Sequence, residues 1–136
     1  MARLALAYAG TLVAFCALDF LWLGTIAKPI YQAEVGALLL PRPNLYAAAA
    51  MYLLYAAGLV GFAIAPALDA GSVWHAVVAA ACLGFVVYGV YDLTNLATLA
   101  GWTPFIAAVD IVWGTALSAA AAAAGYGLAR LAGGSI

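Results

Sequence analysis

Charged residues are what this chain most lacks. Lys, Arg, Asp and Glu make up 7% of its 136 residues, whereas a soluble domain carries roughly a quarter. Hydrophobic residues make up 70%, and the mean hydropathy is +1.16. Such a chain cannot cover itself with a charged surface, so we expect an integral membrane protein. Its four Lys and Arg residues and net charge of −1 are too few to follow a phosphate backbone, which excludes nucleic acid as a partner.

Cysteine and histidine are also scarce. Cys16 and Cys82 lie inside apolar runs without metal-ligand spacing, and the single histidine, His75, stands apart from the acidic residues of the spans. We therefore expect no disulfide framework, no metal and no cofactor. No nucleophile motif or cofactor fingerprint is visible either, which leaves open whether the chain is an enzyme.

Four apolar segments are long enough to cross a membrane, which takes about 20 residues in a helix. They cover approximately residues 4–26, 45–65, 73–99 and 104–131. Asn44 is suited to cap the second helix, and Thr103-Pro104 is typical of a helix start. The last three segments are joined by short connections, which predict antiparallel neighbours.

The first and second spans are joined by a longer connection, residues 27–43. Its middle, approximately residues 29–40, is amphipathic and too short to span, so we expect a short interfacial helix or part of a lid. Its charged and aromatic side chains are Lys28, Tyr31, Glu34 and Arg42. The predicted fold class is all-α: one domain over residues 1–136, a polytopic membrane four-helix bundle with this interfacial helix between helices 1 and 2. Each side carries two basic residues, which leaves the orientation open.

Polar residues share one face of the third span. Tyr88, Tyr91, Asp92 and Asn95 are spaced i, i+3, i+4 and i+7, which places them on one side of a helix. A carboxylate at membrane depth is costly, so it faces protein or water by default and marks a working site.

Three carboxylates fall at one predicted depth. Asp19, Asp92 and Asp110 each lie about seven residues from the end of a span on the side of the 27–43 connection, or ~10 Å at the rise of a helix. Because three buried carboxylates cannot all be ionised without compensation, the sequence requires shared protons, a bound cation, or Lys28 or Arg42 folding in.

Aromatic residues accompany these carboxylates. Trp22 and Trp113 each follow an aspartate at i+3 and therefore share its helix face. Tyr52 and Tyr55 reach the same level from the second span. The predicted ligand-binding residues are Asp19, Trp22, Tyr52, Tyr55, Tyr88, Tyr91, Asp92, Asn95, Asp110 and Trp113.

Several of these segments resemble a known family. The strings are Asp19-Phe-Leu-Trp-Leu-Gly24, Ala27-Lys-Pro-Ile-Tyr31, Tyr88-Gly-Val-Tyr-Asp-Leu-Thr-Asn-Leu-Ala-Thr-Leu99, Gly101-Trp102 and Val109-Asp-Ile-Val-Trp-Gly-Thr115. They are similar to the bacterial membrane proteins grouped as domain-of-unknown-function family 2177. Ala100 stands where that family usually has Lys. The resemblance implies a multi-pass inner-membrane protein, encoded near lipid-modifying enzymes.

Three functions fit these observations. The first is a binding site for a lipid or a small lipophilic molecule, which needs apolar walls and a few convergent polar groups. The second is proton or cation translocation, because intramembrane carboxylates serve as relays. The third is a structural or assembly subunit of a larger membrane complex, and a homo-oligomer is also open. We favour the first, with membrane lipids as partners.

Overall fold

The structure is a computed structural model that describes residues 1–133. Its elements are α1 (Ala2–Leu21), η1 (Trp22–Ile26), α2 (Ala27–Val35), η2 (Gly36–Leu38), α3 (Leu45–Leu59), η3 (Val60–Ile64), α4 (Ala65–Ala70), α5 (Val73–Thr98) and α6 (Pro104–Gly133). Within the described residues, four helical stretches are long and apolar enough to cross a membrane: Ala2–Leu38, Leu45–Ala70, Val73–Thr98 and Pro104–Ala132. The predicted all-α membrane bundle is confirmed.

Two of these stretches contain a wide, π-helical turn. In η1 the amide of Ala27 donates to the carbonyl oxygen of Trp22. In η3 the amide of Ala65 donates to the carbonyl oxygen of Val60. A proline follows each turn closely: Pro29 follows η1, and Pro66 follows η3. Proline lacks the amide hydrogen and crowds the preceding turn, and a π turn is one way for a helix to absorb that disturbance. The first helix therefore runs on into α2, where the sequence had suggested a separate helix after residue 26.

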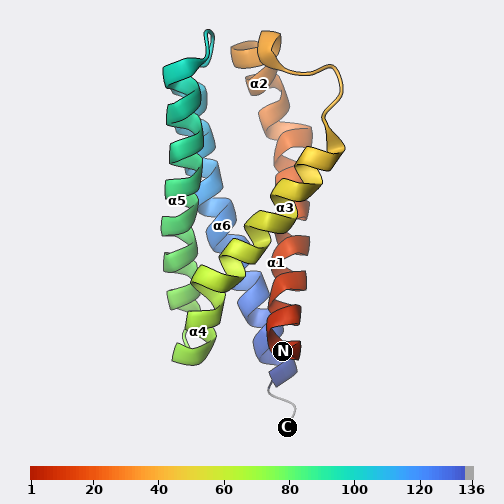
Figure 1. Ribbon diagram of the computed structural model, residues 1–136, viewed down its shortest axis with the longest axis vertical. Coiled ribbons are helices and arrows are strands. Elements are labelled where there is room, and N and C mark those ends of the chain that lie inside the picture. Colours follow the sequence, from red (N-terminus) through yellow and green to blue (C-terminus); the bar gives the residue numbers. More distant parts are fainter. Residues whose placement is uncertain (134–136) are drawn as a thin grey trace.

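The helices form an elongated bundle. In Figure 1, α1, α5 and α6 run along the long axis, and α3 crosses in front of them from the α1 side toward α5. Helix α6 packs along both α1 and α5, whereas α3 packs on α1 and η3 on α5. The first turn of α3 is capped by Asn44 Oδ1, which accepts from the amides of Tyr46 and Ala47 at 3.1 Å. Thr103 Oγ1 accepts from the amide of Ile106 at 3.2 Å at the start of α6.

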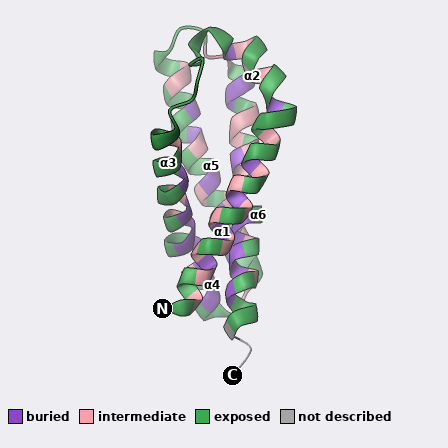
Figure 2. Ribbon diagram, turned by 90° about the vertical axis from the view of Figure 1, so that its right-hand side faces the viewer, coloured by how far each residue is buried: buried purple, intermediate pink, exposed green. Residues whose placement is uncertain are grey.

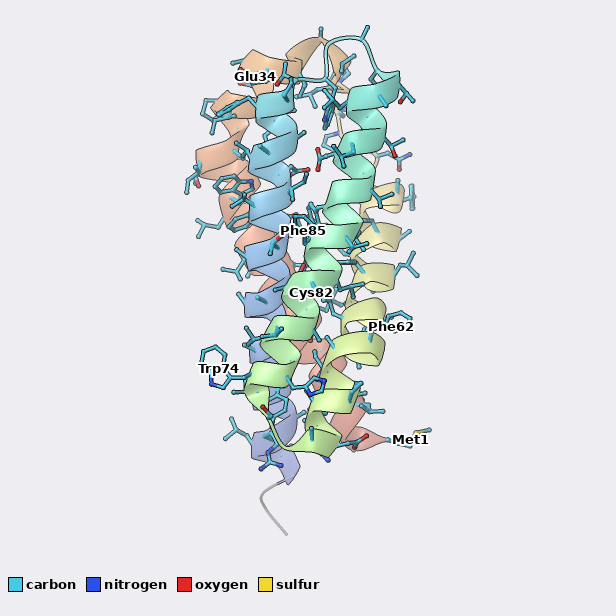
Figure 3. All side chains as sticks on the ribbon, turned by 90° about the vertical axis from the view of Figure 1, so that its left-hand side faces the viewer. Met1, Glu34, Phe62, Trp74, Cys82 and Phe85 are labelled. Carbon is cyan, nitrogen blue, oxygen red and sulfur yellow. The ribbon has the colours of Figure 1, made fainter. Side chains whose placement is uncertain are left out.

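The surface and the interior are both apolar. Buried residues line the inside of the bundle, and exposed residues cover the outside of each helix in Figure 2. Large apolar side chains stand on that outer surface, among them Phe62, Trp74 and Phe85 (Figure 3). Exposed apolar surface of this extent is suited to contact with acyl chains. The fold is that of a multi-pass membrane protein.

Candidate functional site

Asp19 joins three helices. Its side chain is 7% exposed. Oδ2 accepts a hydrogen bond from the Tyr52 hydroxyl at 2.5 Å, and Oδ1 accepts one from Trp113 Nε1 at 3.2 Å. The Trp113 ring stacks on that of Trp22, with centroids 4.5 Å apart and planes at 11°. Asp19 on α1 is therefore satisfied by donors from α3 and α6, and both predicted tryptophans lie beside it.

Asp110 and Glu34 fix α2 to the start of α6. The Tyr31 hydroxyl donates a hydrogen bond to Asp110 Oδ1. Thr103 Oγ1 donates to Glu34 Oε2 at 2.6 Å. The phenol of Tyr31 also lies within electrostatic range of Asp92 and Asp19. Helix α2 therefore closes the site on the side of the 27–43 connection.

Asp92 differs from the other two carboxylates in its hydrogen bonding. Its side chain is 0% exposed, and neither of its oxygens has a hydrogen-bond partner among the described residues. The carboxyl of Asp110 and the indole of Trp102 lie close enough to interact with it, and a proton shared between the two carboxyls would join Asp92 to Asp110. Trp102 Nε1 also has no partner among the described residues. The Trp102 ring meets Tyr91 edge to face, with centroids 6.0 Å apart. A buried polar group left unpaired costs about 1–3 kcal/mol, and this cost distinguishes Asp92 from Asp19 and Asp110, which accept hydrogen bonds.

A second layer of polar contacts lies toward the middle of the bundle. The hydroxyls of Tyr55 and Ser118 are 2.8 Å apart. The Tyr55 ring meets those of Phe15 and Tyr88 edge to face, with centroids 5.3 and 6.1 Å away. Tyr88 also lies against the backbone of Gly114. The packed rings of Phe15, Tyr55 and Tyr88 therefore lie below the carboxylates, toward the middle of the bundle.

Comparison with known proteins identifies the family. A family model described as predicted membrane protein (DUF2177) matches residues 4–127. The chain belongs to this family. The resemblance noted in the sequence is thereby confirmed. No curated protein and no solved structure matches the chain.

The predicted site residues of this DUF2177 protein fall into three groups. Those in the hydrogen-bonded and stacked network, or beside it, are Asp19, Trp22, Tyr31, Tyr52, Asp92, Asp110 and Trp113. Tyr55 and Tyr88 lie in the layer beneath. Tyr91 is 54% exposed, Asn95 is partly buried, and Lys28 and Arg42 are exposed. Among the described residues, neither of these basic side chains pairs with a carboxylate. Asp19 accepts hydrogen bonds from a phenol and an indole, and Asp110 accepts one from the phenol of Tyr31.

Four residues of the site were not predicted by the sequence to contribute to it. They are Phe15, Trp102, Thr103 and Ser118. In the sequence, Trp102 and Tyr31 have the pattern of aromatic-belt residues at a membrane boundary. That pattern does not indicate that their side chains lie beside the carboxylates. Within residues 1–133, no three His, Cys, Asp or Glu side chains gather closely enough to hold a metal ion.

We expect Tyr52→Phe to lower the free energy of unfolding of this DUF2177 protein by about 1–3 kcal/mol, because it leaves a buried carboxylate oxygen of Asp19 without its donor. Tyr46→Phe is the matched control, since Tyr46 is 92% exposed at the start of the same helix. Unfolding of the purified protein in mixed micelles with rising dodecyl sulfate measures both. Equal stabilities of the two variants would contradict the bond.

Proposed function

We propose that this protein binds a lipid or a small lipophilic molecule whose polar group reaches Asp92. The observation that carries the proposal is the difference between the buried aspartates. Asp19 accepts two hydrogen bonds from other helices, whereas both oxygens of Asp92 are buried without a partner among the described residues. If these carboxylates served packing alone, Asp92 would be expected to have donors as Asp19 does.

The surroundings of Asp92 favour a lipophilic ligand. Aromatic rings line the region, and a few polar atoms converge in it, as in sites for small apolar molecules. Tyr91, on the same turn of α5, is 54% exposed on the outer surface of the bundle. In a membrane that surface meets acyl chains, so the ligand would keep its chain in the lipid. Because Asp92 is fully buried, side chains beside it, such as that of Trp102, must move to admit the polar group.

Retention of such a ligand tests the proposal. The wild-type protein, Asp92→Asn and Asp69→Asn are purified in a mild detergent, and mass spectrometry identifies the lipids and small molecules that remain bound. Asp69 is exposed on α4, away from the site, which makes Asp69→Asn a matched control. We expect a species bound in a fixed ratio to the wild type and to Asp69→Asn, and its loss from Asp92→Asn. The same species on all three proteins, or none on any, would overturn the proposal.

A further inference from the structure

The groups around Asp92 also indicate the chemical class of the ligand's polar group. Resting on the proposed function, we infer that the site takes a cationic amine, carried either by a membrane lipid or by a free alkylamine. Within the part of the chain that the structure describes, the site combines adjacent carboxylates, one of them fully buried without a partner, with aromatic rings and no ion-paired basic side chain.

The distribution of charge disfavours an anionic head group. The four basic residues of the described chain are engaged elsewhere or exposed: Arg3 donates to the carbonyl of Leu68, Arg130 is in the last turn of α6, and Lys28 and Arg42 are exposed. A phosphate or carboxylate entering beside Asp92 would meet Asp110 and Asp19 without a compensating cation. Like charges at such range, away from water, repel strongly.

An ammonium group suits the site better than a neutral hydroxyl. Asp92 and Asp110 are adjacent, so they share a proton when the site is empty, and both are ionised together only when a cation lies between or beside them. An ammonium brings a positive charge and up to three N–H donors, enough for both oxygens of Asp92, whereas a hydroxyl brings one donor and no charge.

The aromatic rings add a second attraction for a cation. Trp22 and Trp113 are stacked beside Asp19, and Tyr91 and Trp102 meet edge to face near Asp92. The faces of indole and phenol rings attract ammonium groups, most strongly where water is excluded. An ammonium lying against the face of one of these rings would gain this attraction in addition to that of the carboxylates, whereas a neutral or anionic group of the same size would not.

Three probes with one alkyl chain separate the alternatives. Dodecylamine, dodecanol and dodecanoate are titrated into the protein in neutral maltoside micelles, and binding is followed by tryptophan emission. Wild type, Asp92→Asn and Asp69→Asn are compared in the same micelles, so partition of each probe into the detergent cancels. We expect dodecylamine to bind the wild type and Asp69→Asn about tenfold more tightly than either other probe, and Asp92→Asn to lose about that factor, the equivalent of ~1.4 kcal/mol.

The outcomes distinguish this inference from the function on which it rests. Binding of dodecanol or dodecanoate as tight as that of the amine, and weakened in Asp92→Asn, would overturn the amine class and leave a lipophilic site. Binding of all three probes unaffected by Asp92→Asn would overturn both. The order of the three probes on the wild type, corrected for the partition of each probe into the same micelles without protein, needs no variant, so it tests the amine class even if Asp92→Asn does not fold.

Discussion

Replacing Asp92 with leucine is expected to raise the free energy of unfolding of the ligand-free protein by about 1–3 kcal/mol. Both oxygens of Asp92 are buried without a partner among the described residues, so the folded state loses their solvation and gains nothing in return. Leucine has a similar branched shape and brings no polar atom. Such a gain in stability is what the proposed binding role predicts, because binding sites commonly trade stability for function.

Asp19→Leu is expected to lower the free energy of unfolding. That change leaves the Tyr52 hydroxyl and Trp113 Nε1 without their acceptor, and each orphaned buried donor costs about 1–3 kcal/mol. The free energies of unfolding of both variants are measured in mixed micelles with rising dodecyl sulfate, after removal of bound lipid. If Asp92→Leu destabilised the protein as much as Asp19→Leu, Asp92 would have a partner within the bundle and would serve to join helices.

The four spans could be predicted because their signal is local. Length and apolarity alone identify a spanning helix, and the caps at Asn44 and Thr103 mark two starts that the structure shows. The course of the first helix after residue 26 was harder to predict. Pro29 is read as a helix end in most sequences, whereas here a π turn from Trp22 to Ile26 precedes it and the helix continues.

The depth of the carboxylates could be predicted from the sequence, but their partners could not. The rise of a helix gives the depth of a residue. Pairing depends on the rotation of each helix about its axis, and a soluble helix reveals that rotation by its apolar face. Here lipid and interior are both apolar, so the sequence carries little of that signal. It therefore could not show that Tyr52 donates to Asp19, that Tyr31 donates to Asp110, or that Asp92 has no donor among residues 1–133.

Gly84→Ala is expected to lower the free energy of unfolding by about 1–3 kcal/mol, the usual range for overpacking a filled interior. Helices α5 and α6 form the most extensive helix pair of the bundle. A Cβ at Gly84 would lie 2.5 Å from Ser118 Oγ and 2.7 Å from the carbonyl oxygen of Gly114. Because the second atom belongs to the backbone of α6, the two helices must move apart to admit the methyl group.

The same change should disturb the site, because Ser118 bonds to Tyr55 and Gly114 supports the ring of Tyr88. Gly127→Ala on α6 is the matched control, since a Cβ there meets nothing within 4 Å and alanine favours the helix by up to about 1 kcal/mol. Unfolding in mixed micelles compares their stabilities, and near-ultraviolet circular dichroism reports on the aromatic rings. We expect Gly84→Ala to lose both stability and aromatic signal while Gly127→Ala keeps both. Equal behaviour of the two variants would mean that α5 and α6 lie farther apart than the glycine contact requires.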